Sequence, residues 1–301
     1  ETMLKACGWH IDEQINLSKD YQETCRLQIE ADNLYQEELI NKAYEDEEKT
    51  SSREPRNYIG ASIVGNQCEA LIAFSLRGFP DSELGYKLKR IFRDGHRIED
   101  DVVRDIKKAK VKVMDVDPYT GKQWSFEGFG GHAVGHADGI LETHNGESLL
   151  LEIKSMNANK FKEFSTKGVK FSHRHYYSQV QFMLGLGKMS SCVFIAYCKN
   201  DSEYHSEIIE YDEFHFNELA YKVERVLDGE ARKISQDPSD WRCRGCFKRD
   251  VCWNEKEPRK TMRSCKSYKP LMKGGWKCER GCQAECQQWE KYQPLPKTSN
   301  I

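Results

Sequence analysis

Two stretches of the sequence, Gly135–Ile140 and Leu149–Ser155, hold residue types that could carry out metal-assisted hydrolysis. Asp138 lies in the first stretch, and Glu152 and Lys154 lie in the second, which is otherwise apolar. Residues two apart on a strand point to the same face, so Glu152 and Lys154 should project together from a buried strand. A buried charge is costly unless it is paired or holds a metal. The pair is therefore either a buried ion pair or part of a metal-dependent phosphodiester site.

Hydrolysis of a phosphodiester needs a metal-generated hydroxide, stabilisation of the transition state and help for the leaving oxygen. Mg²⁺ prefers oxygen ligands, which Asp138 and Glu152 would supply from neighbouring strands. Lys154 can orient the attacking water or stabilise developing charge. Glu99 is a further candidate, because it lies beside the apolar Ile98 on a predicted helix, where a carboxylate is unusual. The alternative for Glu99 is a solvent-facing position.

Cysteine is abundant, with 12 residues, and seven of them lie between Cys243 and Cys286. The sequence shows no signal peptide and no membrane-spanning run, so we expect a soluble intracellular chain in which cysteines favour metal over disulfides. Cys243, Cys246 and Cys252 have the spacing C-x2-C-x5-C. Structural zinc and iron–sulfur clusters need four ligands, and Cys68 is the obvious fourth.

A second group of cysteines lies in the C-terminal tail: Cys265, Cys278, Cys282 and Cys286. A segment this small cannot build its own core, and a tetrathiolate zinc site would fold it. The spacing is not that of a standard zinc finger, and the alternative is that the tail has a purely structural role. Residues 240–301 contain 15 Lys and Arg residues and 7 Asp and Glu residues, whereas residues 1–54 contain 6 basic and 14 acidic residues of these types. Such a basic tail is suited to gripping a nucleic-acid backbone.

The spacing of apolar residues predicts the elements that must position these side chains. Helices are predicted at residues 11–48, 84–109, 176–186 and 213–229, and strands at 111–116, 124–129, 134–141, 148–153, 191–199 and 207–211. Ser62 is expected to cap a helix that carries Cys68. Residues 156–172 are polar and basic, with no predicted element. The turns at 117–121 and 144–147 have hairpin chemistry, so the strands around them should be antiparallel. This order predicts an α/β core with a central mixed sheet flanked by helices.

In its acidic residues the sequence resembles the PD-(D/E)xK nucleases. In that superfamily a core helix supplies an acidic residue, and an Asp followed by Glu-x-Lys comes from a hairpin. Glu99, Asp138, Glu152 and Lys154 match these elements in order, and Ile153 would offer its backbone carbonyl to the metal. The resemblance covers roughly residues 56–255 and implies a restriction-endonuclease-like core. His96 is a less certain neighbour of the site.

A helix with Gln and Tyr narrows the resemblance to the RecB-like and phage λ-exonuclease-like branch. Here Gln179 and Tyr177 match, which implies that both touch substrate. RecB-like proteins often carry a Tyr four residues after the Gln, where this chain has Met183; the difference favours the phage-exonuclease variant. One early cysteine, a nuclease core and three late cysteines resemble the iron–sulfur nucleases, including AddB and CRISPR-associated RecB-like nucleases. This implies a 4Fe–4S cluster at Cys68 and the later trio, with zinc as the runner-up.

The resemblance implies a Mg²⁺- or Mn²⁺-dependent deoxyribonuclease, with DNA as its partner. We expect an exonuclease on single strands or duplex ends, of phage type, in recombination, repair, replication or DNA degradation. An endonuclease or nickase on the same core, and a non-catalytic nucleic-acid-binding module, stay open. Three domains are expected: an acidic helical arm at 1–54, which is suited to packing or oligomer contact, the nuclease core at 55–255, and the tail at 256–301. A recombination partner protein would be compatible with this role.

Overall fold

A computed structural model describes residues 19–50, 54–83, 85–283 and 286–297 of the 301-residue chain. The chain divides into two compact units, which are described separately. The first joins Glu1–Arg53 to Leu84–Ile91, and the second joins Glu54–Glu83 to Phe92–Ile301. The expected domain boundaries at residues 54 and 255 stay a prediction.

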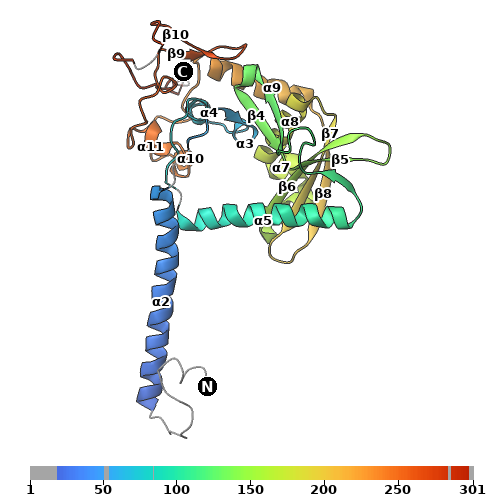
Figure 1. Cartoon of the computed structure of the whole chain (residues 1–301), viewed down its shortest axis with the longest axis vertical. Coiled ribbons are helices and arrows are strands. Elements are labelled where there is room, and N and C mark those ends of the chain that lie inside the picture. Colours follow the sequence, from blue (N-terminus) through green and yellow to red (C-terminus); the bar gives the residue numbers. More distant parts are fainter. Residues whose placement is uncertain (1–18, 51–53, 84, 284–285, 298–301) are drawn as a thin grey trace. The chain divides into compact units, whose positions relative to one another are not determined.

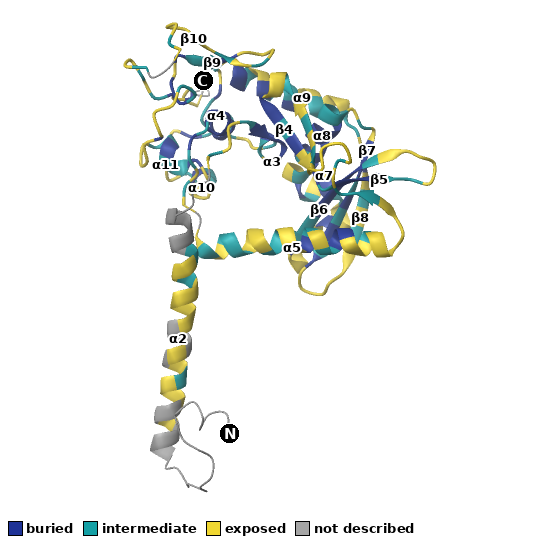
Figure 2. Cartoon of the chain, in the orientation of Figure 1, coloured by how far each residue is buried: buried dark blue, intermediate teal, exposed yellow. Residues whose placement is uncertain are grey.

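The first unit contains one long helix, α2 (Lys19–Thr50), drawn in blue in Figure 1. Residues 11–18, which were also predicted as helix, lie outside the described residues. Arg90 Nη2 donates to Asn41 Oδ1 at 2.7 Å, which links the start of α5 (Tyr86–Lys108) to α2. Most described side chains of α2 are exposed (Figure 2).

Two sheets form the centre of the second unit. The larger has the strand order β2-β5-β6-β7-β8, which are Lys112–Met114, Gly139–Glu142, Ser148–Met156, Ser191–Cys198 and Tyr204–Glu210. Its β6 and β7 are parallel, and its other neighbours are antiparallel. The smaller has the order β1-β4-β3, which are Ile59–Gly60, Ala133–Ala137 and Trp124–Gly128. The predicted α/β core with a central mixed sheet is confirmed.

The predicted strand 134–141 is in fact two strands that meet at Asp138. Residues 133–137 pair in the smaller sheet, and residues 139–142 pair in the larger one. The expected pairing across the turn at 117–121 is wrong for the same reason, since β2 pairs with β5 while β3 pairs with β4. Pairing across the turn at 144–147 is confirmed by the antiparallel β5–β6 hairpin.

Helices cover both faces of the larger sheet. On one face, α5 packs Ile98 and Val102 against Leu151 and Ile153. The opposite face belongs to the main hydrophobic core, to which α8 (Arg174–Gly187) contributes Val180. Figure 2 shows the buried residues concentrated on the central strands and on the inner sides of these helices. Residues 150–153 of β6, which alternate between the two faces, are therefore all buried.

Two predictions for local structure are corrected. Ser62 does not cap a helix that carries Cys68; it lies inside α3 (Ala61–Val64), and Cys68 precedes a separate helix, α4 (Glu69–Leu76). The polar stretch after β6 forms α6 (Ala158–Lys167) and then α7 (Val169–Ser172). Asn157 caps α6 by accepting from Lys160 N at 3.0 Å, a local signal that the sequence contains.

One further long helix is α9 (Glu213–Leu227). The remaining elements are short: η1 (Phe129–Gly131), α10 (Trp241–Arg244), α11 (Arg249–Cys252), β9 (Tyr268–Pro270) and β10 (Trp276–Cys278). Buried Arg77 connects the tail to the core, because its Nη1 donates at 3.0 Å to the carbonyls of Arg263, Cys265 and Tyr268. Its guanidinium also lies 3.8 Å from the Tyr292 ring centroid. No helix in the described ranges has the length and apolarity that a bilayer crossing needs.

Candidate active site

Asp138 occupies the point where the chain leaves the smaller sheet for the larger one. Its backbone N–H donates to Leu151 O at 3.2 Å, and its Oδ2 accepts from Ile153 N at 2.7 Å. These two bonds fix Asp138 against the middle of β6. The Ile153 side chain is buried on the α5 side, and the predicted use of its carbonyl as a metal ligand stays a prediction.

Glu152 and Lys154 project from β6 on the face opposite to Ile153. Glu152 is 1% exposed and forms an ion pair with Lys154. Gln179 Nε2, from α8, donates to Glu152 Oε1 at 2.6 Å. Both interactions use Oε1, and Glu152 Oε2 is buried with no hydrogen-bond partner. An unpaired buried carboxylate oxygen is costly, so this atom is available to a ligand.

Glu99 reaches the same place from α5. Its carboxyl group hydrogen-bonds to Asp138, and the charges of Glu152 and Lys154 also act on it. The nearest atoms of His96 and Glu99, Nδ1 and Oε2, are 3.9 Å apart, and the His96 side chain is 83% exposed. The structure therefore brings together Glu99, Asp138, Glu152, Lys154 and Gln179, and it leaves His96 at the solvent.

The two tyrosines of α8 point in different directions. Tyr177 is buried, and its hydroxyl donates to Asp212 Oδ2 at 2.9 Å, away from the carboxylates. The preceding residue, Tyr176, presents its ring to Lys154, with Nζ 5.5 Å from the ring centroid. Tyr176 is thus the tyrosine beside the site, whereas the sequence motif predicts Tyr177. The motif does not show which of the two adjacent tyrosines faces the same side of the helix as Gln179.

Burial and mutual repulsion alter the acid–base properties of this group. Desolvation, followed by the charge of Asp138, raises the pKa of Glu99 from 4.5 to about 8. Desolvation likewise raises the pKa of Glu152 to about 7, although Lys154 opposes this. Burial disfavours the charge of Lys154, but Glu152 and Asp138 outweigh burial and hold its pKa above the ordinary value. A positive charge among the carboxylates would relieve this repulsion.

The donor atoms suit a hard divalent cation. All three acidic side chains offer oxygen, one oxygen lacks a partner, and the Glu99–Asp138 hydrogen bond needs a proton that a cation would displace. In the described ranges, no three His, Cys, Asp or Glu side chains already surround a point where an ion could sit. Binding would therefore require these side chains to move closer together.

A second candidate site is the thiol cavity, defined by Cys68, Cys243, Cys246 and Cys252. These four residues line one cavity of about 140 Å³, so the structure brings the early cysteine to the late trio. Desolvation raises the pKa of the Cys246 thiol to about 11. Four basic side chains also line the cavity, namely Lys233, Arg242, Lys248 and Arg249. They would offset the negative charge of bound thiolates.

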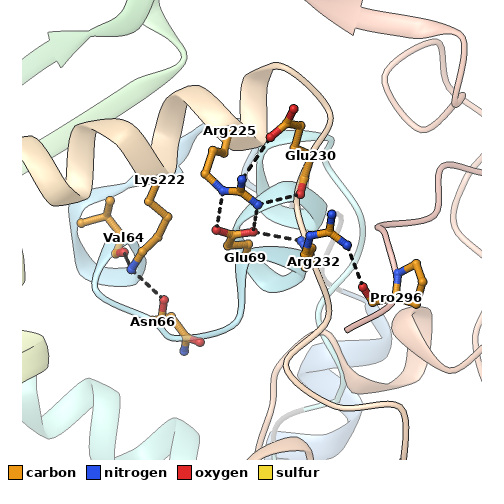
Figure 3. A network of polar contacts seen from close by, with 8 residues as sticks. All are labelled: Val64, Asn66, Glu69, Lys222, Arg225, Glu230, Arg232 and Pro296. Carbon is orange, nitrogen blue, oxygen red and sulfur yellow. Dashed lines mark hydrogen bonds and ion pairs between the residues drawn. The ribbon is translucent and has the colours of Figure 1, made fainter. Parts of the chain in front are cut away.

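Polar contacts from α9 hold the backbone around Cys68 (Figure 3). Lys222 Nζ donates to Val64 O at 3.0 Å and to Asn66 O at 3.1 Å. The Asn66 side chain accepts from Cys68 N at 2.8 Å. The backbone on the N-terminal side of Cys68 is therefore fixed without help from any bound group.

The residue after Cys68 is fixed from the same helix. The Glu69 carboxylate accepts hydrogen bonds from Arg225 Nε at 3.1 Å and from the backbone N–H of Arg232 at 3.0 Å (Figure 3). The next residue along from Arg232, Lys233, donates through Nζ to Cys252 O at 3.0 Å. Cys68 and Cys252 are thus attached to one polar network.

No protein-family model matches the sequence, and no curated protein matches it. Similar solved structures include the alkaline exonuclease LHK-Exo from Laribacter hongkongensis, at a TM-score of 0.40 and 19% identity over 58% of this chain and 88% of that one. The structure of LHK-Exo in complex with dAMP is similar at a TM-score of 0.43 and 18% identity, over 58% of this chain and 88% of that one. The structure of SSO0001 is similar at a TM-score of 0.40 and 16% identity, over 71% of this chain and 95% of that one. The function proposed below rests on the side chains themselves.

Proposed function

We propose that this protein is a divalent-cation-dependent nuclease that hydrolyses phosphodiester bonds of DNA. The observation that carries the proposal is the meeting of Glu99, Asp138 and Glu152, from three separate elements, beside the ammonium group of Lys154. Glu152 is almost fully buried and has an unsatisfied oxygen. A structural ion pair would explain Glu152 and Lys154 alone, but it would not explain two further carboxylates at the same point.

The residues would divide the chemistry between them. Asp138, Glu152, Glu99 and the Ile153 carbonyl would hold Mg²⁺ or Mn²⁺, which when bound polarises a phosphoryl oxygen and lowers the pKa of water. Lys154 keeps its proton at neutral pH because of the carboxylates beside it, so it orients water and stabilises negative charge and does not act as a base.

Two residues of α8 complete the arrangement. Gln179 fixes the Glu152 carboxylate from one side, so that its free oxygen points away from the amide. The Tyr176 ring lies against Lys154 and limits where its ammonium group can go. Basic residues of α6, such as Lys160 and Lys162, are exposed and would hold the DNA strand near the site. We propose an exonuclease on single strands or duplex ends, in phage-type recombination, repair, replication or DNA degradation.

The test is digestion of end-labelled DNA, single- and double-stranded, with Mg²⁺ or Mn²⁺. We expect wild type to release nucleotides, Glu152→Gln and Lys154→Ala to lose at least 100-fold in rate, and Glu147→Gln, an exposed acid on the same hairpin, to act like wild type. Cleavage of covalently closed circles would show an endonuclease or nickase instead. DNA binding without cleavage, or equal cleavage by Glu152→Gln, would refute catalysis at this site.

We further propose that the thiol cavity holds a 4Fe–4S cluster. Cys68 and the later trio line the same cavity, and a 4Fe–4S cluster takes four such thiolate ligands. A zinc ion at the same four cysteines is the alternative. Protein purified without oxygen should show visible absorption and contain iron. Cys243→Ser should lose both, while Cys198→Ser, at a buried cysteine of β7, should keep them. A colourless wild type that contains only zinc would refute the cluster.

A further inference from the structure

Three cysteines of the tail, Cys278, Cys282 and Cys286, lie within nine residues of one another. Cys282 Sγ lies 3.2 Å from Cys286 Sγ. The Gly281 N–H donates to the Cys278 carbonyl at 3.1 Å, which closes a tight turn directly before Cys282. Gly281 has φ +76°, a conformation that glycine adopts without strain.

The fourth tail cysteine lies near this turn. Cys265 is 4% exposed and forms an isolated antiparallel bridge with Lys291. Cys278 pairs with Tyr268 across the β9–β10 hairpin, and the Tyr268 N–H donates to the Cys265 carbonyl at 3.2 Å. Cys265, which is 13 positions before Cys278 in the sequence, therefore lies near the start of the turn that precedes Cys282.

Regular structure contributes little to the stability of the tail. Its described strands are β9 and β10, with three residues each, and a two-stranded hairpin alone is marginally stable. Arg77 attaches the tail to the core through the carbonyls of residues 263, 265 and 268 and through the Tyr292 ring. A cross-link between Cys265 and the three later cysteines would extend this attachment to the segment that carries them.

We propose that Cys278, Cys282 and Cys286, together with Cys265, bind one thiophilic divalent ion of the zinc class, at a site separate from the thiol cavity. Four thiols bind one Zn²⁺ and release four protons to solvent, which leaves a site of net charge −2, and no oxidation takes place. In the part of the chain that is described, no three thiols yet surround one point. The Cys282 and Cys286 sulfurs must move apart from 3.2 Å to about 3.8 Å.

Metal analysis of the full-length protein tests this inference, which is independent of the nuclease proposal. Wild type, Cys282→Ser, Cys286→His and the control Cys198→Ser are purified anaerobically, and zinc and iron per chain are measured. Each protein is then titrated with Cd²⁺, whose thiolate bonds absorb in the ultraviolet. Thermal unfolding and circular dichroism report whether each variant is folded.

We expect wild type and Cys198→Ser to contain one zinc-class ion more per chain than Cys282→Ser. Cys286→His should keep the ion, because imidazole replaces a thiolate at zinc. Iron content should be the same in all four proteins. Equal zinc in folded Cys282→Ser and wild type would overturn the proposal. So would a Cys282–Cys286 disulfide, found by mass spectrometry after the thiols are blocked, in place of zinc. If Cys282→Ser does not fold, loss of the ion from Cys286→Ser but not from Cys286→His still decides the matter.

Discussion

The protonated Glu99 carboxyl group should make the stability of the cation-free protein depend on pH. Its pKa rises from 4.5 to about 8 on folding, because of burial and the neighbouring Asp138. Between these values the folded chain holds a proton that the unfolded chain releases, so the free energy of unfolding falls as the pH rises. Below pH 4.5 both states are protonated, and the effect is absent.

The magnitude follows from the size of the shift. A pKa rise from 4.5 to about 8 corresponds to roughly 5 kcal/mol, since each unit is worth about 1.4 kcal/mol. The Glu99 side chain is 30% exposed, and solvent screening lowers this to about 2–4 kcal/mol. Glu99→Gln mimics the protonated group, so it should equal wild type only below pH 4.5 and exceed it by about 2–4 kcal/mol at pH 9.

Urea unfolding at a series of pH values, in buffers without divalent ions, measures the difference. Asp100→Asn, an exposed neighbour on the same helix, serves as the matched control and should follow the wild-type curve. Adding Mn²⁺ should remove the loss of stability in wild type, because the cation replaces the proton among the carboxylates. If the Glu99→Gln and wild-type curves stay parallel from pH 5 to pH 9, the reasoning about this carboxyl group is wrong.

Three further substitutions test other parts of the structure. Gln179→Ala removes a hydrogen bond to a buried charge, which is worth about 1.5–3 kcal/mol, and should therefore lower kcat about 10- to 100-fold. A rate within twofold of wild type would argue against this. Tyr176→Leu should slow cleavage about 3- to 30-fold, while Tyr176→Phe, which keeps the ring over Lys154, should be near normal in the same assay. Arg77→Met removes three hydrogen bonds to backbone carbonyls and should lower the free energy of unfolding in urea by about 3 kcal/mol or more, whereas an unchanged midpoint would exclude a stabilising role.

The sequence was sufficient to predict the elements that carry Glu99, Glu152 and Lys154, because each depends on local periodicity. Two-residue alternation places Glu152 and Lys154 on one face of β6, as the structure has them. The division at Asp138 was not predictable in the same way. Strand propensity continues through residues 134–141, and only pairing with distant strands decides that the chain changes sheets there.

The sequence could not decide whether Tyr176 or Tyr177 faces the site, because it does not fix the rotation of the helix. Successive residues on a helix point about 100° apart, so a motif that fits either tyrosine cannot say which one faces Lys154. Packing of α8 against the sheet settles the rotation, and it places Tyr177 against Asp212. The contacts around Cys68 were hidden for another reason, because Lys222 and Arg225 lie more than 150 residues further along the chain.

The separation between Cys68 and Cys252 has a consequence for the newly made chain. These residues are 184 positions apart (252 − 68), and they line the same cavity. At roughly 5–20 residues per second, a ribosome takes about 10–40 s to pass from one to the other. During that interval the residues from Glu99 to Gln179 have already emerged, while Cys68, Lys222 and Cys252 cannot yet meet. Assembly of the thiol cavity therefore cannot begin until Cys252 has been made, and the Cys68 thiol must stay reduced until its partners arrive.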